Sequence, residues 1–170
     1  LMEDAVVIVN ERVVSYINSL DRGNSDICNI IEKEAIEDQV PIIRKEMGNL
    51  LKVLLKLKQP KSILEVGTAV GYSSILMSEN MPVDCKIVTI ENYDKRIPIA
   101  RNNIKRAGKE DCIQLIEGDA MEVLKELEGP FDFIFMDAAK GQYINYLPEV
   151  LRLMPHGGLL ISDNILHEGE

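Results

Sequence analysis

Residues 63–71 read Ile-Leu-Glu-Val-Gly-Thr-Ala-Val-Gly, an apolar run that passes directly into a turn of small residues. The run up to Val66 predicts a buried strand, and residues 72–78 have the pattern of a helix. Small residues between a strand and a helix let the backbone approach a ligand closely, with the start of the helix facing it. Taken alone, the turn is explained equally well as a tight structural turn.

Apolar runs and helical segments keep alternating beyond this turn. The sequence predicts further strands at 86–90, 113–116, 131–136 and 159–162, separated by helices at 94–107, 120–127 and 143–154. Short strands that are apolar throughout are typical of a parallel sheet covered by helices on both faces. We therefore expect the α/β fold class, as a doubly wound, Rossmann-like sheet that binds ligands at the carboxyl ends of its strands.

Three helical segments are expected before the first strand, at 4–19, 26–39 and 41–57. Turn residues at 21–24 separate the first two, and Pro41 suits the first turn of the third. No repeat, low-complexity tract or flexible linker divides the chain. We therefore expect a single domain over residues 1–170, made of a helical cap at 1–60 and a core at 61–170.

The composition is that of a globular protein, with 170 residues, 46% hydrophobic and 28% charged. A formal net charge of −9 argues against a generic nucleic-acid binder, and the basic clusters at 52–61 and 101–109 are best explained as solvated helix faces. Three widely spaced cysteines predict neither disulfides nor a zinc site and fit a reducing cytoplasm. No apolar run approaches the ~20 residues of a membrane span, and the N-terminus shows no signal-peptide pattern, so no membrane partner is expected.

Two acids follow the next strands in a way that suggests an adenosine site. Glu91 ends the strand at 86–90, where an acid can accept both hydroxyls of a ribose; alternatively it is an acid placed near a helix start by the dipole. Asp119 follows the third strand, where it would contact an adenine amino group or simply cap the next helix. The glycine turn lacks the G-x-G-x-x-G pattern, which weakens the alternative of a nicotinamide-dependent oxidoreductase.

Hard oxygen ligands gather at the ends of the last two predicted strands. Asp137 follows the run at 131–136, and Asp163 and Asn164 follow the run at 159–162. Two carboxylates and an amide oxygen at adjacent strand ends suit Mg²⁺, Mn²⁺ or Ca²⁺. By itself, the Asp163-Asn164 pair is equally typical of a turn. His156 and His167 have no ligand spacing and are expected to be exposed loop residues.

The motifs Glu65-x-Gly67-x-Ala69-x-Gly71, Glu91, Gly118-Asp119-Ala120 and Asp137 resemble the S-adenosylmethionine site of class I methyltransferases. The stretch Asp137-Ala-Ala-Lys-Gly-Gln-Tyr143 with Ser162-Asp163-Asn164 is similar to the cation-dependent O-methyltransferases of the catechol and caffeoyl-CoA type. The resemblance covers nearly the whole chain. Within that family, the sequence of residues 137–143 is most similar to that of the bacterial tRNA 5-hydroxyuridine methyltransferases.

The resemblance implies a role for each matching residue. Asp137, Asp163 and Asn164 would hold the divalent cation, Mg²⁺ or a similar ion. The residues expected at the S-adenosylmethionine cofactor are Ile43, Glu65, Gly67, Gly71, Ser73, Glu91, Asp119, Ala120 and Asp137, with Ile43 closing over it from the cap. Lys140 would be the general base, assisted by a neighbouring dication that depresses its pKa; the alternative is a surface lysine at a helix start.

A cation-dependent methyl transfer restricts the acceptor to a hydroxyl beside a second oxygen, because both oxygens must chelate the ion. The expected acceptors are 5-hydroxyuridine at the tRNA wobble position or, alternatively, a small catechol-like or caffeoyl-CoA-like molecule. Tyr143 and Tyr146 would shape this pocket or stack on a ring, although their helical spacing suits core packing equally well. A binding module without turnover is a further alternative, disfavoured by the intact ligand acids.

In the family that the chain resembles, the sheet continues past the fifth strand with a helix and an antiparallel strand pair, which commonly contribute to a dimer interface. The sequence ends at Glu170 without them. We therefore expect a truncated chain, with a homodimer as the full-length form and an open sheet edge in the form given.

Overall fold

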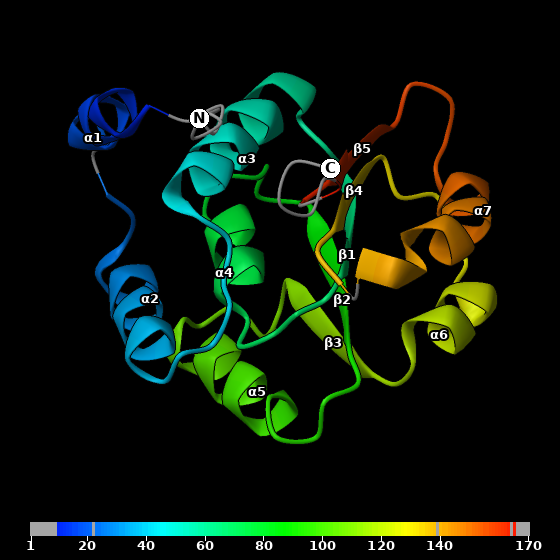
Figure 1. Cartoon of the computed structure of the whole chain (residues 1–170). Helices are drawn as coiled ribbons and strands as arrows, with labels where there is room; N and C mark the ends of the chain where they lie inside the picture. The colour runs from blue at the N-terminus through cyan, green and yellow to red at the C-terminus, as the bar shows by residue number, and fades with distance from the viewer. Residues whose placement is uncertain (1–9, 22, 139, 164, 166–170) are drawn as a thin grey trace, which may run out of the picture.

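The computed structural model describes residues 10–21, 23–138, 140–163 and 165, and within them it forms one parallel five-stranded sheet (Figure 1). The strands lie in the order β3-β2-β1-β4-β5. Their bounds are β1 Ser62–Val66, β2 Lys86–Glu91, β3 Ile113–Glu117, β4 Phe133–Met136 and β5 Leu159–Ser162. All neighbouring pairs are parallel, so the doubly wound α/β fold expected from the sequence is confirmed.

The central strand β1 explains where a ligand site belongs in this sheet. It pairs with β2 on one side, with Val66 opposite Ile90, and with β4 on the other, with Val66 opposite Met136. From β1 the chain winds outward to β2 and β3, and then crosses back to β4 and β5. The connections at the carboxyl ends of β1 and β4 therefore leave in opposite directions, which opens a crevice there in sheets of this type.

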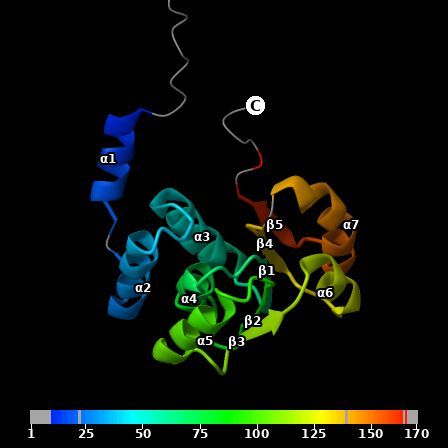
Figure 2. The same ribbon diagram turned by 60° about the horizontal axis from the view of Figure 1, so that its bottom comes forward.

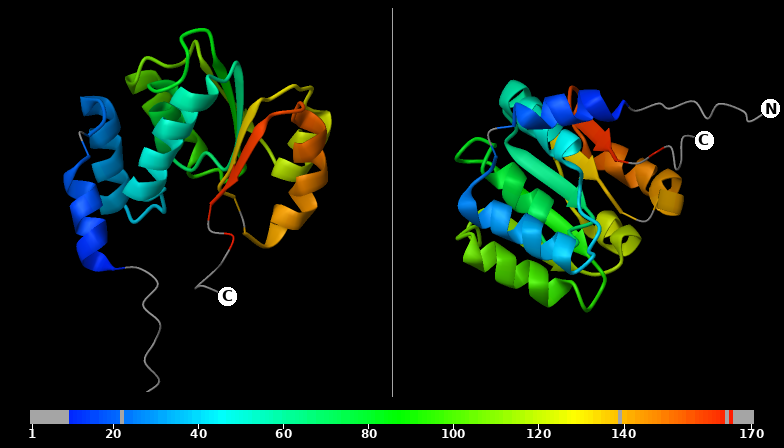
Figure 3. Two further views of the ribbon diagram at one scale, coloured as in Figure 1. Left: turned by 90° about the horizontal axis from the view of Figure 1, so that it is seen from above. Right: turned by 60° about the vertical axis from the view of Figure 1, so that its left-hand side comes forward.

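Helices cover both faces of the sheet, as Figures 1 and 3 show. Helices α4 (Tyr72–Ser78) and α5 (Ile97–Arg106) contribute Ile75 and Ile104 to one core cluster. Helices α6 (Ala120–Glu126) and α7 (Tyr143–Leu153), which follows the 3₁₀ turn η1 (Lys140–Gln142), contribute Leu124 and Val150 to the other cluster. This arrangement buries both sides of the inner strands, which accounts for their lack of polar alternation.

The helical cap consists of α1 (Glu11–Ser19), α2 (Asp26–Glu37) and α3 (Lys45–Lys58). The three helices differ in how much of their surface is packed against the core. Helices α2 and α3 place Ile31 and Leu55 in the same cluster as the residues of α4. Helix α1 buries no side chain and lies outermost, beside α3 (Figure 2). Asn18 of α1 donates a 3.0 Å hydrogen bond to Glu46 of α3. The cap is therefore continuous with the core through α2 and α3.

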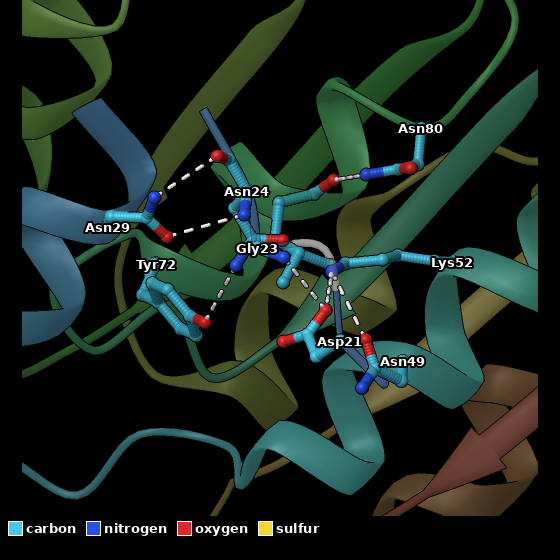
Figure 4. A network of polar contacts seen from close by, with 9 residues as sticks. Asp21, Gly23, Asn24, Asn29, Asn49, Lys52, Tyr72 and Asn80 are labelled. Atoms are coloured by element: carbon cyan, nitrogen blue, oxygen red, sulfur yellow. Dashed lines mark hydrogen bonds and ion pairs between the residues drawn. The ribbon is translucent and has the colours of Figure 1, made fainter. Parts of the chain in front are cut away.

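A polar network fixes the segment between α1 and α2 to the rest of the molecule (Figure 4). Lys52 of α3 lies 3.7 Å from the carboxylate of Asp21 and donates to Asn49 at 3.2 Å. The side-chain amide of Asn24 lies 3.5 Å from the hydroxyl of Tyr72, the first residue of α4. The chain entering α2 is thus attached to α3 and α4 by polar contacts as well as by the core.

Among the predicted starts that fall on described residues, those of the third helix, of α5 and of β4 are wrong by two residues or more. The third helix begins at Lys45 rather than at Pro41, since Arg44 is extended at its N-terminus and Ile43 turns into the core. Helix α5 begins at Ile97 rather than at 94, with a proline in its first turn. Strand β4 begins at Phe133 rather than at 131, because the carboxylate of Asp132 accepts the backbone N–H groups that open β1.

Candidate cofactor and metal site

The turn at residues 67–71, called the cofactor loop below, is held between the ends of β2 and β4. The N–H groups of Gly67 and Thr68 both donate to the carbonyl of Ile90 at 3.1 Å. Gly67 has a φ of +105°, and a Cβ at this position would lie 2.2 Å from the carbonyl oxygen of Asp137. Glycine is therefore required here twice over, once for its backbone conformation and once for the close approach of two backbone segments.

Glu91 ends β2 with its carboxylate directed at the cofactor loop. One oxygen accepts the N–H of Ala69 at 2.8 Å, and the other accepts those of Asn92 and Tyr93 at 3.0 and 2.9 Å. Glu91 is 8% exposed, so these three backbone donors fix its side chain at the rim of the crevice. A carboxylate has about four acceptor sites, so one stays available for a ligand hydroxyl.

Glu65 lies beneath the cofactor loop and has no exposed surface. Its oxygens accept hydrogen bonds from the hydroxyls of Ser73 at 2.5 Å, Thr89 at 2.6 Å and Ser74. Burial raises the pKa of Glu65 to about 7, the three hydroxyl groups oppose that rise, and the charge of Asp137 adds to it. Glu65 therefore lies in a layer under the predicted cofactor residues, and its link toward a ligand runs through Ser73, which is 8% exposed.

At the end of β3, Asp119 adopts the role of a helix cap. It is exposed, and one carboxylate oxygen accepts the N–H groups of Met121 and Glu122 at 2.9 and 3.3 Å. Ala120 begins α6 and is partly buried. Asp119 is therefore the N-cap of α6, as the sequence allowed. Its contact with an adenine group stays a prediction.

Asp137 and Asp163 follow the paired strands β4 and β5. The N–H of Asp163 donates to the carbonyl of Met136 at 3.0 Å, and that of Asp137 donates to Val66 at 2.9 Å. The hydroxyl of Tyr143 lies 3.1 Å from the carbonyl of Asp163 and 3.3 Å from that of Met136, so this side chain joins the two strand ends. Burial, followed by the charges of Asp137 and Asp163, raises the pKa of Tyr143 to about 12.

The remaining predicted metal and catalytic residues are only partly described. Asn164 lies outside the described residues, as does His167. Lys140 begins η1, close after Asp137 in the chain; its role as general base stays a prediction, because its side chain is not among those described. Within the described part of the chain, no group of three or more His, Cys, Asp or Glu side chains is arranged to hold a metal.

The other predicted residues lie as follows. Ile43 is buried in the core cluster of the cap, so its closure over a cofactor also stays a prediction. Tyr146 is 6% exposed and packs in the cluster of α6 and α7, which favours the core-packing alternative. His156 is exposed, as expected. No helix in the described ranges is long and apolar enough to cross a membrane.

Sequence reasoning missed the polar side chains that support the cofactor loop from below and behind. Thr89 accompanies Glu65, and Asn103 of α5 donates from its amide to the carbonyl of Val70 at 2.9 Å. A signal for both was present: Thr89 interrupts an apolar strand, and Asn103 stands beside Ile104 on the buried face of its helix. A polar residue on a buried face requires a partner, which the sequence alone does not identify.

Comparisons with known proteins show which family the chain is similar to. A family model described as O-methyltransferase matches residues 25–170. Catechol O-methyltransferase of Niastella koreensis is 36% identical over 166 residues, which cover 94% of this chain and 75% of that protein. Caffeoyl-CoA O-methyltransferase 1 of Eucalyptus globulus is 38% identical over 131 residues, covering 72% of this chain and 52% of that protein. The chain thus spans about half to three quarters of the length of these two relatives.

Solved structures show the same likeness. The O-methyltransferase from Bacillus cereus, solved in complex with SAH, superposes with a TM-score of 0.85 at 30% identity, over 93% of this chain and 74% of that chain. An O-methyltransferase from Streptomyces achromogenes, solved in complex with SAM, gives a TM-score of 0.83 at 29% identity, with the same coverage of 93% and 74%.

Proposed function

The chain belongs to the O-methyltransferase family, and we propose from this premise that it transfers the methyl group of S-adenosylmethionine to a hydroxyl oxygen of a small acceptor with two adjacent oxygens. The observation that carries the proposal is the junction of the cofactor loop with β2 and β4, where Glu91 meets Ala69 and Gly67 meets Asp137. This junction brings a loop of cofactor-binding type beside a strand end that carries an acid.

The cofactor would lie along the loop, bound by the residues predicted from the sequence. Glu91 would accept the ribose hydroxyls, since its carboxylate is already oriented by backbone donors. Ser73 gives its single proton to Glu65, so toward a ligand it would act as an acceptor. The structures of the relatives solved with SAH and SAM support a cofactor of this class.

The donor set also fits a divalent cation of the Mg²⁺ type. Asp137 and Asp163 follow paired strands, and the N–H of Asp163 donates to the carbonyl of Met136, the neighbour of Asp137, so the two acids lie close together. With Asn164 they would supply only hard oxygen ligands. When bound, such a cation lowers the pKa of an acceptor hydroxyl and fixes its direction.

The residues of the chain would then perform the remaining tasks. Lys140 would receive the hydroxyl proton at its Nζ atom, since it follows Asp137 closely on η1. The close contact of Gly67 with Asp137 fixes the spacing between the cofactor loop and the end of β4. Positioning of this kind supplies much of the acceleration in a transfer between two bound partners.

A catechol-like or caffeoyl-CoA-like acceptor is favoured by the names of the relatives, which are catechol and caffeoyl-CoA O-methyltransferases. The expectation of a tRNA 5-hydroxyuridine acceptor has no support from these comparisons. The net charge of −9 also disfavours tRNA, whose phosphate backbone binds best to a basic surface. In the test below, tRNA therefore serves only as a competing acceptor.

The test incubates the chain with Mg²⁺ and methyl-labelled S-adenosylmethionine, and offers catechol, caffeoyl-CoA or hypomodified tRNA as acceptor. Label is expected in a small acceptor, with loss of transfer in EDTA and a decrease of at least about 100-fold in Asp163→Ala, the upper range for disturbing a metal shell. Label found only in tRNA would overturn the small-acceptor assignment. Full activity of Asp163→Ala in EDTA would remove the cation from the proposal.

A further inference from the structure

Helix α5 carries two arginines that each bind a glutamate with two N–H groups, yet only one of them leads to the cofactor loop. Arg101 donates to Glu117 of β3 at 2.8 and 2.6 Å. Arg106 donates to Glu34 of α2 at 2.7 and 2.9 Å. Ion pairs this exposed contribute little to stability by themselves. Arg106 differs because it also donates to the side-chain oxygen of Asn103 at 2.9 Å.

Asn103 extends this contact into the molecule. It is 3% exposed, and its side-chain amide donates to the carbonyl of Val70 at 2.9 Å. Both ends of the side chain therefore have a partner that fixes its orientation, a donor on one side and an acceptor on the other. A continuous chain of hydrogen bonds runs from Glu34 in the cap, through Arg106 and Asn103, to the cofactor loop.

The loop depends on such support because of its backbone conformation. Val70 stands between Ala69, with a φ of +48°, and Gly71, with a φ of +83°. A left-handed residue other than glycine costs about 1 kcal/mol or more, so a neighbouring restraint is needed to keep the loop in one conformation. The loop also packs on α5 directly, since a Cβ at Gly71 would lie 3.7 Å from the Cα of Ala100.

We propose that Asn103 is a positioning residue for the cofactor, and that Glu34 and Arg106 act through it to couple the helical cap to the cofactor loop. The inference rests on the proposed function only in taking the loop as the place where an S-adenosyl ligand binds. Asn103 holds the Val70 carbonyl, and thereby keeps the N–H of Ala69 directed at Glu91. Neither Asn103 nor Arg106 needs to touch the ligand.

The test measures the Kd of SAH by calorimetry on the 170-residue chain and its variants. Asn103→Asp has the same shape and keeps an acceptor for Arg106, but it places a carboxylate oxygen against the Val70 carbonyl. We expect the Kd to rise about tenfold, since loss of a buried donor costs about that factor. Arg106→Gln and Glu34→Gln, which act one step further away, are expected to raise it about threefold.

Arg101→Gln and Glu117→Gln are the matched controls, since they break the same kind of ion pair on the same helix without reaching the loop. They are expected to leave the Kd of SAH unchanged while lowering the unfolding temperature as little as Arg106→Gln does. In methyl transfer, Asn103→Asp is expected to raise the KM for S-adenosylmethionine with little change in kcat. A role confined to stability would move the unfolding temperature and leave these binding quantities alone.

Unchanged SAH binding in Asn103→Asp, or equal weakening in Arg101→Gln and Arg106→Gln, would overturn the inference. If Asn103→Asp does not fold, the exposed pair carries the test: Arg106→Glu, which places an acceptor against the side-chain oxygen of Asn103, should weaken SAH binding, and Arg106→Lys, which keeps a donor there, should weaken it less. A chain that binds SAH with the expected pattern but methylates no acceptor would count against the proposed function alone. A chain that binds no SAH would overturn both.

Discussion

Glu65 shows how one buried side chain orders several others. When Glu65 is ionised, Thr89 gives its single hydroxyl proton to it, so the hydroxyl of Thr68, 2.6 Å from that of Thr89, donates to Thr89. Ser73 and Ser74 donate to the same carboxyl group. Three hydroxyl protons therefore point toward Glu65 and the fourth toward Thr89, and this fixes the strand end, the cofactor loop and the start of α4 with respect to one another.

The raised pKa of Glu65, about 7 against an ordinary 4.5, predicts a pH dependence of stability. Because the folded chain holds this proton more tightly than the unfolded chain, the contribution is complete below about pH 4.5 and is lost as the pH rises to about 7. Glu65→Gln lacks this titration. From pH 5 to 8, the free energy of unfolding of the natural chain should fall relative to the variant by on the order of 2–3 kcal/mol.

Urea unfolding at several pH values measures this difference. Glu110→Gln, which alters an exposed carboxyl group, is the matched control and should follow the natural chain at every pH. Parallel curves for the natural chain and Glu65→Gln would show that the folded state does not hold this proton.

The alternation of strands and helices was predictable because it depends on patterns within ten or so neighbouring residues. Each strand of the sheet was expected within two residues of its observed start, and the ends of strands carry the predicted acids. The starts of α3 and β4 were not predictable in this way, because Ile43 and Asp132 have partners far away in the chain. The same limit hid Asn103, because helix α4 and strand β2 lie between it and its partner Val70 in the chain.

The cofactor loop predicts a severe effect of one added methyl group. Gly67→Ala forces alanine into a left-handed backbone conformation. It also places the new Cβ only 2.2 Å from the carbonyl oxygen of Asp137. We expect a loss of roughly 3 kcal/mol or more in the free energy of unfolding, together with loss of SAH binding.

Thermal unfolding and calorimetry test both parts of that expectation. Gly141→Ala serves as the control for folding, because a Cβ there meets nothing within 4 Å. Its unfolding temperature should match that of the natural chain. Equal stability of the two alanine variants would contradict the close approach of the loop to β4.

In the described part of the chain, the first helix is packed much less tightly than the helices and strands that follow it. Helix α1 buries no side chain, although Val13, Tyr16, Ile17 and Leu20 give it an apolar face that is largely exposed. Helix α2 buries Cys28, Ile31 and Ala35. Regions with few buried contacts open at low free-energy cost. We therefore expect α1 to unfold locally at a lower free energy than α2.

Limited proteolysis tests this division. A protease of broad specificity should remove α1 first, by cleavage before residue 26, and leave a fragment that contains α2 and the whole sheet. Mass spectrometry of the products over time identifies the first cut. An initial cut inside the sheet region, with α1 still attached, would contradict the prediction.

The contact between Gly67 and the carbonyl of Asp137 has a consequence for protein engineering. No side chain lies between these two backbone segments, so nothing can be trimmed or enlarged to absorb a shift of one against the other. Libraries that aim at new acceptors should therefore leave the path of β4 unchanged and vary side chains in other segments. A redesign that moves β4 would change the recognition of the methyl donor at the same time, and the two specificities could not be selected separately.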